Sequence, residues 1–237
     1  MVIINIIHLE SVDSTNKYLK ENSCTLPDKT LVFSDIQTQG RGRMGRTFIS
    51  NTGGVYMSLL LKTNLDPDFV TIKTAVAVNM AVKEAFNIDT QIKWVNDIYI
   101  NNKKICGILA ESNYNSNTNK FDNIVVGIGL NLVKGNNILP SEIKDRADYL
   151  FKSGNFEEKR QIFIDTFLKI FFSLNDKTEI IEKYRAADYL KGKEITFKKG
   201  DLFIKGIASG IDNGGKLIIK TKNGIEFLNQ GEVTTHF

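Results

Sequence analysis

Residues 37–48 (QTQGRGRMGRTF) constrain the fold of this chain most, because they suit neither a helix, a strand nor a hydrophobic core. Two runs that read as strands, 30–36 and 54–62, flank this segment, so we predict a loop that joins neighbouring strands. Glycine lets successive backbone N–H groups converge on an anion, and arginine adds a planar fork that matches carboxylates and phosphates. The loop contains Gly40, Arg41, Gly42, Arg43, Gly45 and Arg46.

The spacing of these glycines excludes two familiar phosphate loops. No Gly-x4-Gly-Lys-Ser/Thr run occurs, and the loop leads into a strand rather than into a helix. A solvated basic loop is the alternative explanation. Alternation of glycine and arginine between two buried strands favours an anion-binding loop that closes over its ligand.

Composition places the chain among folded proteins and excludes several classes. Its 237 residues are 42% apolar and 24% charged, and the net charge of +4 is too small to indicate nucleic-acid binding by itself. Two cysteines, Cys24 and Cys106, form neither a metal-type pair nor a disulfide framework, which favours a reducing cytoplasm. The apolar start of the chain is too short to span a bilayer and has no leader features, so we expect no membrane partner.

The remaining pattern predicts an α+β domain followed by a small β domain. Helices are expected at 17–21, at 68–86 with Asp68 as N-cap, at 157–174 and at 177–187; strands are expected at 3–9, 91–95, 97–101, 103–111 and 123–133. An Asn- and Ser-rich turn is expected at 113–120. Gly127 and Gly129 interrupt the last of these strands, which often marks close approach of a ligand or another backbone. Five short strands after residue 190 predict an antiparallel barrel, so we place the domains at 1–188 and 189–237.

Five motifs in order give the chain its resemblance to biotin protein ligases. They are Asp-Ser-Thr-Asn at 13–16, the Gly/Arg run at 40–46, Lys-Trp-Val-Asn-Asp at 93–97, Lys104 within 103–111, and Gly-Ile-Gly-Leu-Asn at 127–131. Each motif is weak alone, but the ordered set covers nearly the whole chain and is specific. The resemblance implies a catalytic domain like that of class II aminoacyl-tRNA synthetases, with a mixed sheet and helices, and a C-terminal SH3-like barrel.

The resemblance also implies an activity and its partners. Biotin protein ligases use ATP with Mg²⁺ to make biotinyl-5′-AMP and then biotinylate a lysine of a biotin carboxyl carrier domain. The first predicted strand begins almost at Met1, so the resemblance is to the non-repressor group, which does not bind DNA. The sequence is compatible with a monomer or a homodimer.

Residue roles follow from matching positions in the motifs. Biotin would contact Ser14, Thr15, Asn16, Gln37, Gly40, Arg41, Gly42, Arg43, Lys104 and Gly107. ATP would contact Arg43, Gly45, Arg46, Phe48, Lys93, Asn96 and Asn131. Arg41, Arg43, Lys104 and Asp97 would be catalytic, with Asp97 orienting or deprotonating the acceptor lysine. No metal ligand is assigned.

Each role has a structural alternative. Ser14, Thr15 and Asn16 could simply cap a helix, Lys104 could be a solvated hairpin lysine, and Asp97 could anchor Lys93. Trp94 is expected to pack rather than to stack on a ligand.

Three departures from the family pattern are visible. Phe48 replaces the usual tryptophan, Val95 replaces the usual proline, and segment 229–233 lacks an arginine that some members place near the nucleotide. The sequence therefore does not decide whether the barrel takes a direct part in ATP binding.

Three other functions fit parts of the pattern. Lipoate protein ligase uses the same adenylate chemistry, but the Gly/Arg run together with Lys-Trp-x-Asn-Asp favours biotin. A nucleic-acid-binding protein would need aromatic platforms and a strongly basic face. A non-catalytic biotin-binding module would have no use for phosphate-facing arginines.

Overall fold

A computed structural model describes residues 3–63, 65–115, 120–229, 231 and 233–235 of the chain. Its larger part is a seven-stranded sheet, with strand order β1-β2-β3-β7-β6-β5-β4. β1 pairs with β2 in parallel and the other neighbours are antiparallel, so the predicted mixed sheet is confirmed. The strands are β1 (Asn5–Val12), β2 (Thr30–Gln37), β3 (Gly54–Leu61), β4 (Gln91–Lys93), β5 (Asp97–Ile100), β6 (Lys103–Asn115) and β7 (Lys120–Asn131).

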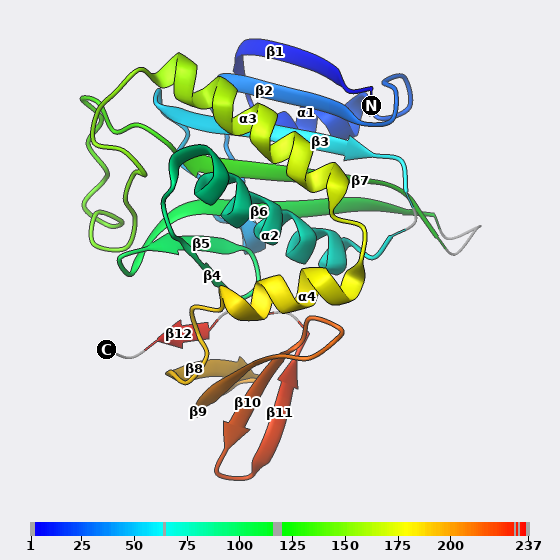
Figure 1. Ribbon diagram of the computed structural model, residues 1–237. Helices are drawn as coiled ribbons and strands as arrows, with labels where there is room; N and C mark the ends of the chain where they lie inside the picture. The colour runs from blue at the N-terminus through cyan, green and yellow to red at the C-terminus, as the bar shows by residue number, and fades with distance from the viewer. Residues whose placement is uncertain (1–2, 64, 116–119, 230, 232, 236–237) are drawn as a thin grey trace.

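Helices cover both faces of this sheet (Figure 1). α2 (Pro67–Phe86) and α3 (Phe156–Ser173) lie side by side across one face, and the short α1 (Thr15–Glu21) lies behind the sheet in this view. Every residue of β3 is buried, as expected for a strand covered on both faces. None of the helices in the described ranges is long and apolar enough to cross a bilayer.

The predicted elements agree with the observed ones apart from their ends. The N-cap of α2 is Asp66, whose side chain accepts from the Asp68 backbone N–H, so the prediction of Asp68 as cap was wrong. Pro67 explains the difference, because proline is favoured in the first turn, where its missing N–H costs nothing. Of the turn predicted at 113–120, residues 116–119 lie outside the described ranges.

The C-terminal part is a second sheet of five antiparallel strands, in the order β11-β10-β9-β8-β12. Its strands are β8 (Glu194–Lys199), β9 (Leu202–Ile211), β10 (Leu217–Thr221), β11 (Gly224–Leu228) and β12 (Val233–Thr235). α4 (Lys177–Ala186) leads to it (Figure 1). Residues 230 and 232 of the segment without arginine lie outside the described ranges.

Contacts around β4 join the two sheets. The Ile92 N–H donates to Ala187 O at 2.7 Å, and the Tyr189 N–H donates to Ile92 O at 2.9 Å. The indole N–H of Trp94, which is 5% exposed, donates to Gly215 O at 3.0 Å. Trp94 therefore packs, as predicted, and ties the second sheet to the strand that precedes Asn96 and Asp97.

Candidate active site

A cavity of about 840 Å³ lies where the predicted motifs meet. Residues from α1, the Gly/Arg loop, β4–β7 and β12 line it, and loop 143–147 closes one side. The sequence motifs are therefore brought together by the strand order, although they are far apart in the chain. The predicted site residues that line the cavity are Ser14, Thr15, Asn16, Gln37, Arg41, Gly42, Arg43, Arg46, Phe48, Lys93, Asn96, Asp97, Lys104, Gly107 and Asn131.

Gly40 and Gly45 do not line the cavity. A Cβ at Gly40 would lie 2.3 Å from Phe48 O and 2.5 Å from Ser50 Oγ, so this glycine lets the two legs of the loop pack together. Gly45 has φ +74°, and a Cβ there would meet open space, so its backbone conformation rather than crowding favours glycine at this turn. Both glycines shape the loop in this structure.

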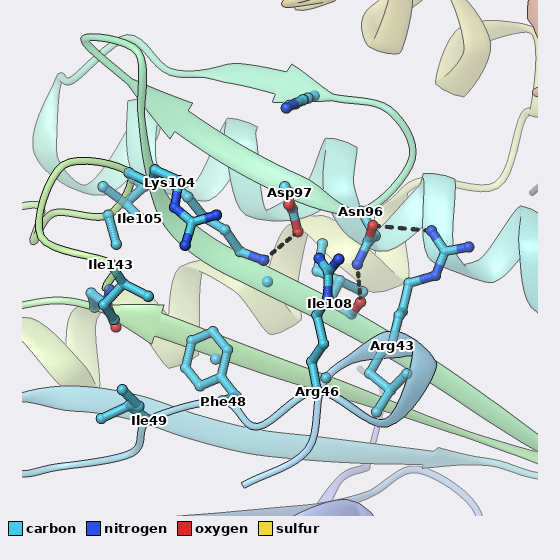
Figure 2. Close-up of a pocket in the computed structure, with 18 of the residues that line it drawn as sticks. Arg43, Arg46, Phe48, Ile49, Asn96, Asp97, Lys104, Ile105, Ile108 and Ile143 are labelled. Carbon is cyan, nitrogen blue, oxygen red and sulfur yellow. Dashed lines mark hydrogen bonds and ion pairs between the residues drawn. The ribbon is translucent and has the colours of Figure 1, made fainter. Parts of the chain in front are cut away.

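The Gly/Arg loop forms a short irregular hairpin over the cavity. The Gly42 N–H donates to Arg46 O at 2.7 Å, and the Phe48 N–H donates to Gly40 O at 2.9 Å. Arg43 is half-buried, and its guanidinium donates to Asn96 Oδ1 at 3.2 Å (Figure 2). Arg41 and Arg46 are exposed. The loop thus places cations both inside the cavity and at its rim.

One end of the cavity is polar and buried. The Thr15 N–H and hydroxyl both lie against Gln37 Oε1, at 2.9 and 3.1 Å, and the Ser58 hydroxyl lies 2.7 Å from Thr15 Oγ1. Ser14 caps α1 by accepting from the Lys17 N–H, so the helix cap and the polar end of the cavity are one structure. Thr15 is 3% exposed and Ser58 is fully buried.

The sequence analysis singled out Gly127 and Gly129 as points where a ligand or another backbone could come close. In the structure Gly129 and its cross-strand neighbour Gly107 form a smooth part of the cavity wall. Gly107 and Gly129 face each other across β6 and β7, and a Cβ at Gly129 would lie 2.6 Å from the Phe48 ring. A Cβ at Gly107 would lie 3.1 Å from Lys104 Nζ. The close approach is therefore made by the chain's own Phe48 and Lys104 side chains in this structure.

Lys104 and Asp97 form an ion pair in the middle of the cavity (Figure 2). Lys104 Nζ lies 2.7 Å from Asp97 Oδ1, and the two side chains are 32% and 23% exposed. Lys104 is therefore not a solvated hairpin residue, and Asp97 Oδ1 has Lys104 as an ion-pair partner. Such a pair brings an ammonium and a carboxylate to the same reacting region.

Asn96 and Asn131 also line the cavity, and their side-chain amides donate to backbone carbonyls. Asn96 Nδ2 donates to Ile108 O at 2.7 Å, which fixes the side chain that accepts from Arg43. Asn131 Nδ2 donates to Asp148 O at 3.1 Å and so holds the start of the segment after loop 143–147. Lys93 Nζ lies 5.3 Å from the centre of the Tyr99 ring. These amides keep oxygen acceptors in the wall of the cavity.

Several cavity residues were missed by the sequence analysis. They come from the β5–β6 hairpin, from loop 143–147 and from the second sheet, where no motif marked them. No motif marks Arg146 or Tyr189, because only the fold brings them to the cavity. The one available signal was that Arg146 is an arginine in an irregular segment. The missed residues include Tyr99, Asn102, Asp145, Arg146, Tyr189, Thr234 and Thr235.

Comparisons with known proteins identify the relatives of this chain. A family model described as the biotin/lipoate A/B protein ligase family matches residues 8–131, and one described as the biotin protein ligase C terminal domain matches residues 191–234. The bifunctional ligase/repressor BirA of Bacillus subtilis (strain 168) is 33% identical over 235 residues, which cover 95% of this chain and 71% of that protein. The biotin–[acetyl-CoA-carboxylase] ligase of Paracoccus denitrificans is 26% identical over 240 residues, 95% of this chain and 98% of that protein.

A solved structure shares nearly the entire fold. Biotin protein ligase from Aquifex aeolicus, in complex with biotin and ATP, superposes with a TM-score of 0.81 and 31% sequence identity. The match covers 99% of both chains, so it includes the second sheet as well as the larger one.

Proposed function

Since the chain belongs to the biotin/lipoate A/B protein ligase family, we propose that it activates biotin with ATP and transfers the biotinyl group to a protein lysine. One observation carries the proposal. A single cavity joins a polar end, formed by Thr15 and Gln37 with the buried Ser58 behind Thr15, to a cationic region that contains Arg43 and Lys104. This arrangement suits an acid with a polar head and a carboxylate that must meet a nucleotide.

In the first half-reaction the biotin carboxylate attacks the α-phosphorus of ATP. A carboxylate–phosphorus bond forms, the bond from the α-phosphorus to the bridging oxygen breaks, and pyrophosphate leaves. Because the carboxylate is already ionised, no base is required. The obstacle is repulsion between two anions, which Arg43, Lys104 and the rim arginines offset by fixed positive charge.

Magnesium would enter as the ATP complex and would neutralise charge on the phosphates. Mg²⁺ is usually held by one or two carboxylates together with substrate phosphates rather than by an all-protein cage. The described residues include no group of three or more His, Cys, Asp or Glu side chains placed to hold a metal ion. Asp145 and Asp97 are the carboxylates in the cavity wall that could each contribute an oxygen.

In the second half-reaction a neutral lysine of the carrier domain attacks the acyl carbonyl. The carbon–nitrogen bond forms, the carbon–oxygen bond to phosphate breaks, and AMP leaves. Asp97 would orient the amine or take its proton, since it lies beside Lys104 at the same reacting centre. We also propose that the acceptor lysine lies on a carrier domain and that the protein works in the cytoplasm. The boundary between its two domains is proposed to lie between residues 188 and 189.

Asp97→Asn is expected to slow transfer from preformed biotinyl-5′-AMP to a carrier domain by about 10²–10³-fold, because the amide can neither accept the proton nor pair with the Lys104 ammonium. Adenylate formation should fall less. Single-turnover transfer with purified adenylate separates the two steps. Transfer at the parent rate would remove Asp97 as base and as orienting group.

The Gly/Arg loop should become protected when both substrates bind. Arg41 and Arg46 are exposed trypsin sites in this structure, and closure over the adenylate would bury their backbone. Cleavage within residues 40–46 should therefore be several-fold slower with biotin, ATP and Mg²⁺ than without them. The exposed Lys62, which does not line the cavity, supplies the internal control. Equal cleavage of the loop in both conditions would argue against closure.

Biotin rather than lipoate is the substrate that the polar end favours. The ureido ring of biotin offers two N–H donors and one carbonyl acceptor, whereas the dithiolane of lipoate offers neither. A site built to hydrogen-bond a substrate can reject an analogue without those groups by about 10⁴-fold. Pyrophosphate release measured with each acid in turn should show this preference for biotin; a preference for lipoate would replace the proposed substrate.

A further inference from the structure

A hydrogen-bond network lies behind the polar end of the cavity and extends away from the cavity. Asn16 Nδ2 donates to Leu109 O at 3.1 Å and to Glu111 Oε2 at 2.9 Å, and Ser58 Oγ lies 2.6 Å from Asn16 Oδ1. Lys20 Nζ donates to Glu111 Oε1 at 2.6 Å. Glu111 does not line the cavity, so it can act on a ligand only through Asn16 and the groups beyond it.

The number of available protons determines which group donates at each step of this hydrogen-bond network. Both protons of the Asn16 amide nitrogen are used, so Asn16 Oδ1 can only accept, and the single Ser58 proton must go to it. The Thr15 hydroxyl has one proton and two acceptors within reach, Ser58 Oγ at 2.7 Å and Gln37 Oε1 at 3.1 Å. Whichever of them takes this proton, the Thr15 oxygen can then only accept, so it presents an acceptor at the cavity wall.

Glu111 determines which groups of the network donate and which accept, because an ionised carboxylate can only accept hydrogen bonds. Its side chain is 21% exposed. Burial alone would raise the pKa of Glu111, but hydrogen bonds from Lys20 and Asn16 outweigh it and hold this pKa below the ordinary value. The carboxylate therefore stays charged at neutral pH and keeps the nitrogen of the Asn16 amide turned toward it.

Gly127 makes room for the turned amide. A Cβ at this position would lie 2.2 Å from Asn16 Oδ1, so the amide can rest on β7 only where the strand has no side chain. Ser58 and Gly127 are paired across β3 and β7, which brings the hydroxyl to the same point. Three strands thus converge on one amide, and its orientation is built into the sheet.

We propose that Glu111 is a positioning residue that fixes the polar end of the cavity as a hydrogen-bond acceptor for the ureido N–H groups of the acid substrate. The inference rests on the proposed function. It adds that this network favours a ligand whose polar group donates hydrogen bonds to the protein. Glu111 touches no substrate and takes part in no bond change.

Glu111→Gln tests this role, because the amide is nearly isosteric yet can donate as well as accept, and so lets the network reverse. Loss of one hydrogen bond to a charged group predicts that biotin affinity, measured by calorimetry without ATP, falls by about 10–100-fold. The KM for biotin should rise similarly, while kcat at saturating biotin and the KM for ATP stay within about twofold. Glu10→Gln removes the same charge from an exposed strand position and should bind biotin as the parent does.

A second readout separates recognition from general loosening. A biotin analogue methylated on one ureido nitrogen lacks a donor, so the parent should strongly prefer biotin over it, and Glu111→Gln should show a much smaller preference. Should that variant not fold, Lys20→Gln serves instead, and its biotin affinity should decline at a higher pH than the parent's as the solution is acidified, because the Glu111 carboxylate has lost the ammonium that lowers its pKa.

The outcomes are distinct. A folded Glu111→Gln with parental biotin affinity and parental discrimination against the methylated analogue overturns the role of Glu111 and leaves the proposed function standing. For Lys20→Gln, an affinity that follows the parent's pH dependence has the same meaning. A parent chain that does not bind biotin overturns the proposed function itself, whatever the variants do.

Discussion

Lys104→Met is expected to slow adenylate formation by about 10²–10³-fold, the usual cost of removing one fixed donor from developing negative charge. Lys104 lines the cavity, and its Nζ lies 2.7 Å from Asp97 Oδ1 and beside Gly107. Without it, the carboxylate of biotin and the α-phosphate lose a shared counter-charge. Pyrophosphate release in a single turnover measures the effect.

Two controls sharpen this test. Lys222→Met removes an exposed lysine of the β10–β11 turn that does not line the cavity and should leave the rate within about twofold. Lys104→Met also leaves Asp97 as an unpaired, largely buried carboxylate, so the double variant Lys104→Met/Asp97→Asn shows how much of the loss comes from that charge. A parental adenylation rate in Lys104→Met would contradict the assignment.

Arg43→Ala is expected to be almost as damaging to adenylation, by about 10²-fold, and to let more adenylate escape from the site. Arg43 is the half-buried arginine of the loop, and its bond to Asn96 links the loop to the segment that carries Asp97. Removing it takes away both a cation and the contact that holds the loop to the wall. Pyrophosphate release and filtration of free adenylate measure the two effects.

Arg43→Lys provides the matched comparison. Lysine keeps the charge but not the planar fork, so its rate should lie between those of the parent and Arg43→Ala. Equal rates for parent and Arg43→Ala would show that the loop arginine inside the cavity is not used in adenylation.

Local pattern was enough to predict most of the fold. The strands around the Gly/Arg loop, the long α2 and the five short C-terminal strands were found from periodicity and turn residues, with ends that differ by a few positions. The start of α2 was misplaced because Asp66 and Asp68 flank Pro67, and proline at the first helical position makes Asp66 the cap. The strand order was not accessible, since the pairing of β3 with β7 and of β7 with β6 depends on contacts distant in sequence.

In the candidate site, too, some residues could be predicted from local sequence and others depend on the fold. Residues in recognisable motifs, such as Thr15, Arg43 and Lys104, could be predicted because their spacing is local. Ser58 and Glu111 could not, because each looks like an ordinary strand residue until the sheet places it against Asn16. Those two residues form the support that the motif alone does not reveal.

Formation of an acyl-adenylate in this cavity is the central claim. The most direct measurement is to incubate the purified chain with biotin, ATP and Mg²⁺, separate the protein from free nucleotide, and determine by mass spectrometry what it retains. We predict close to one biotinyl-5′-AMP per chain, with an equal amount of pyrophosphate released, and neither product when biotin is omitted. Retention of unreacted ATP and biotin, or pyrophosphate release that does not depend on biotin, would contradict the account.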